Sequence, residues 1–124
     1  MMKMPTILVV EDEASIRKLA VANLSARGYD VIAVESAEQG LVHLTTRPIA
    51  LILLDIKLPG MRGWEFLTAT AGDPRIAPNI PVIVMTASAA DSEVRAPGYP
   101  NVVKVLIKPF SIQVLLQAIA DVLR

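Results

Sequence analysis

Polar residues that could carry out chemistry stand at the ends of four apolar segments. They are the pair Glu11-Asp12 after residues 6–10, Asp55 at the end of 51–55, Thr86 at the end of 81–86, and Lys108 after 102–107. If these segments are neighbouring strands, three carboxylates meet, and each pair at about 4 Å costs about 4 kcal/mol at an effective dielectric constant of about 20. A divalent cation removes this repulsion, and oxygen ligands in a sequence without cysteine favour Mg²⁺. A carboxylate beside Mg²⁺ and a lysine is a candidate nucleophile toward a phosphoryl group.

The segments that position these residues have the pattern of buried strands. Residues 51–55 read Leu-Ile-Leu-Leu-Asp, a continuous apolar run that is typical of a parallel strand covered on both faces. The other predicted strands are 6–10, 30–34, 81–86 and 102–107. Parallel strands present their carboxyl ends at one edge of the sheet, where open α/β folds bind ligands. We therefore expect the polar residues to meet at that edge.

Helical patterns separate the strands. The first predicted helix has Ile16, Leu19, Ala20 and Leu24 on one apolar face and Gly28 at its C-terminal cap. This alternation of strand and helix predicts an α/β fold with a doubly wound parallel sheet and right-handed crossovers.

The remaining helices differ in the strength of their signals. Ser36 and Gln39 have the spacing of a capping box, and a third helix begins near Trp64 and ends at residues 72–74. A short fourth helix is predicted at 91–96. The last helix has a clear apolar stripe, made of Ile112, Leu115, Leu116, Ile119 and Leu123, and a second one made of Val114, Ala118 and Val122.

Composition sets limits on the class of protein. The 124 residues are 53% hydrophobic and only 4% aromatic, which predicts one domain, residues 1–124, with an aliphatic core. Twelve basic and twelve acidic residues give a net charge of zero without a basic block, so no direct nucleic-acid partner is expected. No segment approaches the length of a membrane span. We expect a soluble, cytoplasmic protein that does not contact the membrane.

Four motifs, taken together and in order, resemble a response-regulator receiver domain of two-component signalling, the CheY-like module. They are Val9-Val10-Glu11-Asp12-Glu13, the segment 53–63 around Asp55 (Leu-Leu-Asp-Ile-Lys-Leu-Pro-Gly-Met-Arg-Gly), Val84-Met85-Thr86-Ala87 and Lys108-Pro109-Phe110. The resemblance runs from about residue 6 to residue 123. It implies a (βα)5 fold with five parallel strands in the order 2-1-3-4-5.

The resemblance also implies roles for the residues at the sheet edge. Asp55 would accept a phosphoryl group from a phosphohistidine on a sensor histidine kinase or a histidine phosphotransfer protein. Mg²⁺ would be bound by Asp12, Asp55 and the backbone carbonyl of Lys57, while Glu11 would act on the metal more indirectly, often through water.

Two further residues would act on the phosphoryl group itself. Lys108 would hold one phosphoryl oxygen, and Thr86 would move to hydrogen-bond another, which switches the conformation that a partner or effector protein recognises. The domain would hydrolyse its own acyl phosphate without being a conventional enzyme.

A homodimer is a further candidate assembly, through the second apolar stripe of the last helix.

One position departs from the family pattern. Three residues before the lysine the family commonly has Tyr or Phe, whose ring moves with the threonine, whereas this chain has Val105. Phosphorylation does not require that ring, but the usual output route does. The departure predicts an atypical signalling face around residues 88–105.

One alternative function class stays open at this point. A Mg²⁺-dependent phosphohydrolase of the aspartyl-phosphate type would share the aspartate nucleophile and the lysine. That class usually has a second carboxylate two residues after the nucleophile, where this chain has Lys57. A dinucleotide-binding module is less favoured still, because no Gly-x-Gly-x-x-Gly follows the first strand.

Overall fold

A computed structural model describes residues 4–58, 60–87 and 99–124 of the chain. Within them lie five strands, β1 (Thr6–Val10), β2 (Asp30–Val34), β3 (Leu51–Asp55), β4 (Val82–Thr86) and β5 (Val102–Ile107). They form one parallel sheet in the order β2-β1-β3-β4-β5, which confirms the predicted fold and strand order. The described helices are α1 (Ala14–Ala26), α2 (Ala37–Thr46), α3 (Gly63–Gly72) and α4 (Ile112–Leu123).

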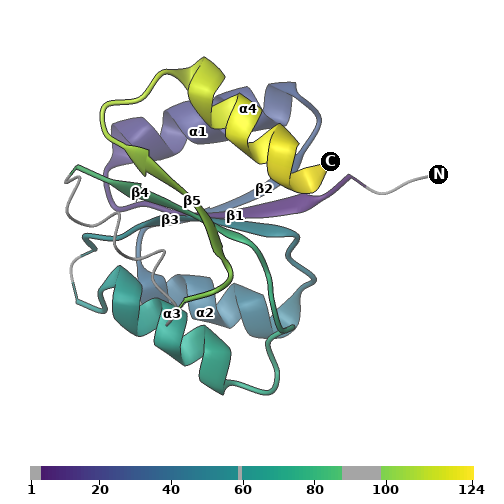
Figure 1. The fold of residues 1–124 in the computed structure, drawn as a ribbon, viewed down its shortest axis with the longest axis vertical. Coiled ribbons are helices and arrows are strands. Elements are labelled where there is room, and N and C mark those ends of the chain that lie inside the picture. The colour runs from purple at the N-terminus through teal and green to yellow at the C-terminus, as the bar shows by residue number, and fades with distance from the viewer. Residues whose placement is uncertain (1–3, 59, 88–98) are drawn as a thin grey trace.

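The helices cover both faces of the sheet (Figure 1). Helices α1 and α4 lie on one face, and α2 and α3 lie on the other. The predicted helix at 91–96 lies outside the described residues, as does most of the face predicted at 88–105. Of the described helices, none has the length and apolar character needed to cross a lipid bilayer.

The central strands, β3 and β4, are buried on both faces of the sheet. Every residue of β3 and β4 is buried, as expected for parallel strands covered on both faces. Side chains of β3 alternate between two cores, with Leu51 and Leu53 on the side of α1 and α4 and Ile52 and Leu54 on the side of α2 and α3. Asp55 is therefore fixed at the end of a strand that is packed from both sides.

Helix α1 ends as predicted, but one residue of its predicted apolar face is exposed. Gly28 adopts a positive φ of 92°, and the N–H groups of Gly28 and Tyr29 donate to the carbonyls of Ser25 and Leu24, which is a Schellman motif. Leu19, however, is 55% exposed, so its predicted place on the apolar face was wrong.

The error at Leu19 has a geometric reason. Residues three and four positions apart both satisfy a helical period, but a helix advances about 100° per residue. Ala20 and Leu24 are buried, so the centre of the buried face lies between them. Ile16, four residues before Ala20, is only partly buried. Leu19 then lies about 120° away, in solvent.

The capping box predicted at α2 forms only in part. Ser36 is the N-cap, and its side chain accepts from the Gln39 backbone N–H at 3.2 Å. The Gln39 side chain accepts from the N–H of Glu35 at 3.0 Å, one residue before the cap. The box therefore closes around Glu35, the residue that follows β2.

The second apolar stripe predicted on α4 is divided between core and solvent. Ala118 is buried and Val122 packs against the core beneath α1 and α4, so both widen the buried face of the helix. Val114 is 49% exposed. The stripe does not form a continuous exposed surface.

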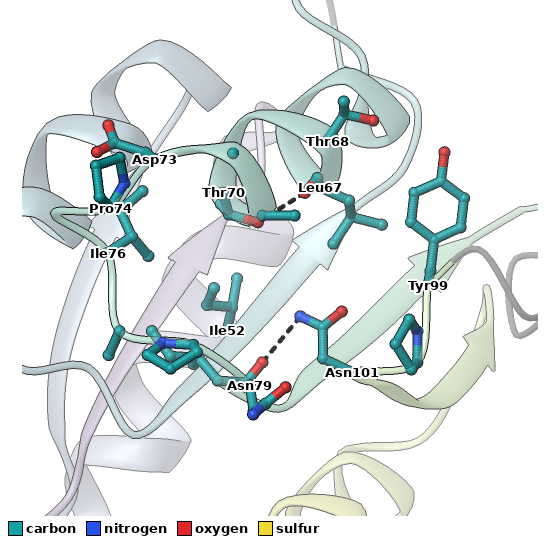
Figure 2. A pocket seen from close by; sticks show the side chains of 16 residues that line it. Ile52, Leu67, Thr68, Thr70, Asp73, Pro74, Ile76, Asn79, Tyr99 and Asn101 are labelled. Carbon is teal, nitrogen blue, oxygen red and sulfur yellow. Dashed lines mark hydrogen bonds between the residues drawn. The ribbon is translucent and has the colours of Figure 1, made fainter.

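A cavity of about 750 Å³ lies at the amino edge of the sheet (Figure 2). The start of β3, the end of α3 and the segments preceding β4 and β5 surround it, and Ile52, Leu67 and Asn101 point into it. Asn101 is held there, since its Nδ2 donates to the Ile80 carbonyl at 3.1 Å. This edge is opposite the one at which Asp55 lies.

The third helix begins beside Trp64, as predicted, and the Trp64 side chain packs there. It is partly buried against the core beneath α2 and α3, and its ring centroid lies 5.5 Å from that of Tyr99. Val105 packs against the same core. This core is therefore lined by an aromatic pair, Trp64 and Tyr99, while position 105 contributes an aliphatic side chain.

Gly63 is required where α3 begins. Its N–H donates to the carbonyl of Ile56, the residue after Asp55, at 3.1 Å. A Cβ at position 63 would lie 2.5 Å from Ile56 Cδ1 and 2.8 Å from Ile56 Cα, which is closer than carbon atoms approach one another. The absence of a side chain at Gly63 therefore keeps α3 close to the end of β3.

We predict that Gly63→Ala lowers the free energy of unfolding by about 1 to 3 kcal/mol, because the backbone of Ile56 has to move. Gly72→Ala at the other end of the same helix is the control, since a Cβ there meets nothing within 4 Å. The control is expected to change stability by less than about 1 kcal/mol. Urea denaturation measures both, and equal effects would contradict the steric account.

Candidate metal centre at the carboxyl edge of the sheet

The sheet register brings the acidic residues together. Val10 pairs with Leu54, so Glu11, which follows β1, lies level with Asp55, the last residue of the neighbouring strand β3. Carboxylate oxygens of Glu11, Asp12 and Asp55 lie within 4.8 Å of one another. Glu11 and Asp55 are buried, whereas Asp12 is exposed.

Glu11 is held through both its backbone and its side chain. Its backbone N–H donates to the carbonyl of Val34 at 3.1 Å, which extends the β1–β2 pairing by one bond. One carboxylate oxygen accepts from the Glu13 N–H at 3.2 Å, and the other accepts from Lys108 Nζ at 2.9 Å. A fully buried carboxylate requires such partners, because burial disfavours its charged form.

Asp55 is fixed in a similar way. The Lys57 N–H donates to Asp55 Oδ1 at 3.0 Å, and Lys108 Nζ donates to Oδ2 at 3.3 Å. The Lys57 side chain is exposed. The chain therefore turns back over the Asp55 carboxylate immediately after β3, which leaves the backbone of Lys57 next to it.

Lys108 joins the ends of three strands. Its backbone N–H donates to the carbonyl of Thr86 at 2.7 Å, and its ammonium contacts Glu11 and Asp55. Thr86 is fully buried at the end of β4, directly after Met85, which pairs with Asp55. The structure thus brings all the residues selected from the sequence to one edge of the sheet.

The protein environment shifts the pKa of two groups. Burial raises the pKa of Glu11 to about 7, with a further rise from the neighbouring Asp55 and an opposing effect of Lys108. Burial disfavours the charge of Lys108, but its contacts with Glu11 and Asp55 raise the pKa of the ammonium above its usual value. Without a cation at the site, Glu11 therefore retains its proton up to near-neutral pH.

The donor set fits Mg²⁺. Three carboxylates face one ammonium, so the cluster keeps a net negative charge when all three are ionised. Within the described part of the chain, no cationic side chain contacts the carboxylate of Asp12. An oxygen-only, partly solvated site of this charge suits an ion that keeps several waters. The carboxylates of Glu11, Asp12 and Asp55 are the oxygen ligands that this site could offer to such an ion.

We predict that the metal-free protein loses stability as the pH rises from about 4.5 to about 7. The folded state binds the Glu11 proton more tightly than the unfolded state does, so this contribution is complete below about 4.5 and is lost through the folded pKa of about 7. The expected loss is on the order of 2 to 3 kcal/mol. Urea denaturation across this range measures it.

The control for this prediction is Glu11→Gln, which removes the titrating group while keeping the shape of the side chain. The difference between the two proteins isolates Glu11 from every other titration. Saturating Mg²⁺ should also suppress the loss, because a cation replaces the proton. Identical pH profiles for the wild type and Glu11→Gln would contradict the prediction.

Arg17 also belongs to the structure of this site, and the sequence patterns did not select it. Its Nη1 donates to the backbone carbonyls of Glu11 at 2.9 Å and Asp12 at 3.3 Å. One signal was available in the sequence. A basic residue in the first turn of a helix opposes the helix dipole, so Arg17 there indicates some compensating contact.

Comparison with known proteins agrees with this geometry. The family model described as "Response regulator receiver domain" matches residues 7–120. The transcriptional regulatory protein HprR of Escherichia coli is 37% identical over 119 residues, which cover 95% of this chain and 51% of that protein. The chain spans between about a quarter and about half of the length of the curated relatives it matches.

Solved structures show the same fold. The chemotaxis response regulator CheY4 of Vibrio cholerae superposes with a TM-score of 0.86 at 24% identity, covering 97% of this chain and 99% of that one, and shows the fold alone. The response regulator TrrA of Thermotoga maritima, in complex with Mg²⁺-BeF, has a TM-score of 0.81 at 25% identity over 96% of this chain and 99% of that one. With a family match over most of its length, the chain belongs to the response regulator receiver domain family.

Proposed function

We propose that residues 1–124 form one receiver domain in which Asp55 accepts a phosphoryl group from a phosphohistidine. The observation that carries the proposal is the environment of the Asp55 carboxylate. It lies at the end of a buried central strand, 3.3 Å from Lys108 Nζ and within 4.8 Å of two further carboxylates. A carboxylate in such a place suits attack on phosphorus, provided that charge is neutralised around it.

Mg²⁺ is the proposed cofactor. Asp12 and Asp55 would bind it through their carboxylates and Lys57 through its backbone carbonyl, while Glu11 would act through a metal-bound water. When bound, the ion neutralises the developing charge on the phosphoryl oxygens. TrrA was solved in complex with Mg²⁺-BeF, which supports Mg²⁺ as the ion in a site of this family.

The transfer itself is an in-line displacement. A carboxylate oxygen of Asp55 forms a bond to phosphorus while the phosphorus–nitrogen bond of the phosphohistidine breaks, and the imidazole leaves with the electron pair of that bond. Lys108 neutralises a phosphoryl oxygen, since its ammonium already lies between Glu11 and Asp55. Thr86, at the end of the adjacent strand β4, donates its hydroxyl to another phosphoryl oxygen.

The partners follow from this chemistry. The phosphodonor is a sensor histidine kinase or a histidine phosphotransfer protein, and the modified domain signals to an effector protein or domain in the cytoplasm. HprR, a transcriptional regulatory protein, is about twice as long as the part that this chain matches. Direct binding of nucleic acid by these 124 residues is not proposed, because their net charge is zero. A homodimer is a candidate form of the signalling state, but the second apolar stripe of α4 offers it only the exposed Val114.

The hydrolase alternative is less well supported by the site. It needs an acid or base two residues after the nucleophile, where Lys57 has an exposed side chain and offers only its backbone to Asp55. No other observation favours it. The stoichiometry of the reaction separates the two functions.

The test is intact-mass spectrometry after incubation with Mg²⁺ and acetyl phosphate, beside a sample with chelator. We expect a gain of one phosphoryl group per chain that requires the metal, without multiple turnover of simple phosphate esters. Steady release of phosphate from such esters would favour the hydrolase. If acetyl phosphate gives no gain, the assay is repeated with a phosphorylated phosphotransfer protein, and failure with both donors would overturn the proposal.

A further inference from the structure

Arg17 connects the first turn of α1 to the loop that carries the acidic pair. Its Nη1 donates to the carbonyl of Glu11 at 2.9 Å and to that of Asp12 at 3.3 Å. Its other terminal nitrogen lies 4.0 Å from Glu35, which is 64% exposed, so that ion pair contributes little. The Arg17 side chain itself is only 20% exposed. Its main contacts are therefore the two backbone carbonyls.

The position of this cation is locally unfavourable. The N-terminal end of a helix carries a partial positive charge, which disfavours a basic side chain in the first turn. The guanidinium offsets this cost by bonding two carbonyl oxygens that would otherwise need other donors, a task for which its several N–H groups are well suited. The neighbouring Lys18 is exposed and makes no such contact among the described residues.

These contacts determine how the loop is held. Glu11 is fixed by its own N–H, which donates to Val34, and by the Glu13 N–H, which donates to its carboxylate. Asp12 follows without a strand partner, and its carbonyl is held by Arg17. When a carboxylate on a mobile loop binds a metal, it loses more conformational entropy than a carboxylate that is already fixed. A constraint on the loop therefore favours metal binding.

We propose that Arg17 is a positioning residue that orients the Glu11–Asp12 backbone for binding of Mg²⁺. The inference rests on the proposed function, because it concerns the same metal site. The proposed role of Arg17 and the charge of Arg17 have opposite effects on Mg²⁺ binding. The guanidinium repels a nearby cation, so as a mere charge it would weaken Mg²⁺ binding, whereas as a positioning group it strengthens it.

The sign of the effect therefore provides the test. Arg17→Met removes the hydrogen bonds and the charge while keeping most of the aliphatic chain. If Arg17 positions the loop, the Mg²⁺ dissociation constant measured by titration calorimetry rises about tenfold or more. Lys18→Met is the matched control, which removes a charge from the adjacent residue and should leave the constant unchanged or slightly lower. Arg17→Lys, with one cationic group but no planar fork, should fall between the wild type and Arg17→Met.

Two further readouts separate positioning from a general loss of stability. In the metal-free protein, hydrogen exchange of the Glu13 amide, followed by NMR, should speed up in Arg17→Met because its acceptor Glu11 is less well fixed. Exchange in the centres of β3 and β4 should not change. At saturating Mg²⁺, phosphorylation by acetyl phosphate should recover to one group per chain, since only the metal affinity is altered.

The outcomes distinguish this inference from the proposed function. A wild-type protein that neither binds Mg²⁺ nor takes a phosphoryl group overturns the proposed function. A wild-type protein that does both, with an Arg17→Met variant that binds Mg²⁺ equally or more tightly, overturns only the role of Arg17. If Arg17→Met does not fold, Arg17→Lys decides, because unchanged affinity and unchanged Glu13 exchange in that variant would also contradict positioning.

Discussion

Asp55→Asn is expected to abolish phosphoryl transfer to the chain. Under conditions in which the wild type gains one phosphoryl group from acetyl phosphate and Mg²⁺, the variant should gain none, because a carboxamide cannot form the acyl phosphate. Intact-mass spectrometry measures the gain directly. The control is Asp30→Asn, which changes an aspartate at the start of β2, where its carboxylate accepts, among the described residues, only from the Thr6 hydroxyl. The control should be phosphorylated like the wild type.

The same variant has a second expected effect that does not depend on phosphorylation. Asp55 raises the pKa of Glu11, both by a hydrogen bond and by its charge. Without the charge of Asp55 the pKa of Glu11 falls toward its ordinary value, so the metal-free variant should lose less stability than the wild type as the pH rises toward 7. Phosphoryl incorporation into Asp55→Asn would show that another residue is the acceptor. An unchanged pH profile would show that the two carboxylates do not interact.

The sequence was informative about the strands because their pattern is simple. A run such as Leu51–Asp55 has few interpretations, and the structure buries every residue of it. Spacing of three and four residues in α1, by contrast, was compatible with two helix faces, and only packing against β1 and β2 selects the one that excludes Leu19. The strand order came from the resemblance to a family, since the pattern of a parallel strand does not identify its neighbours.

The candidate site was predictable in its members but not in its contacts. Glu11 and Lys108 are 97 residues apart, and their separation of 2.9 Å follows from the register of four strands. The rise in the Glu11 pKa depends on burial, which sequence patterns do not give for a single carboxylate. Arg17 escaped selection because its contacts are to backbone carbonyls, whose direction is determined only when the loop folds.

Lys108→Met should destabilise the metal-free protein by about 3 kcal/mol near a pH of about 8. Lys108 is the cation that contacts both Glu11 and Asp55 among the described residues, and its removal leaves buried carboxylates without a counter-charge. Lys104→Met on the same strand is the control. The Lys104 side chain is 42% exposed and its ammonium lies 3.9 Å from Asp121, so its loss should cost less than about 1 kcal/mol.

The loss in Lys108→Met should depend on pH in a defined direction. Lys108 lowers the pKa of Glu11, so its removal raises that pKa further above its unfolded value. The folded variant then takes up a proton at a higher pH, and most of the lost stability returns as the pH falls toward about 5. Urea denaturation at both pH values measures this difference. A loss that is the same at both would indicate missing packing of the lysine stem rather than a missing charge.

The variant should also separate metal binding from phosphoryl transfer. Removing the positive charge of Lys108 lowers the repulsion of Mg²⁺, so calorimetry should show equal or tighter Mg²⁺ binding. Transfer from acetyl phosphate should nevertheless slow by about a hundredfold, because one donor to the developing phosphoryl charge is gone. Tight Mg²⁺ binding with slow transfer would show that Lys108 acts on the phosphoryl group. Weakened Mg²⁺ binding would instead mean that the ion pairs of Lys108 hold Glu11 and Asp55 in the arrangement that the metal needs.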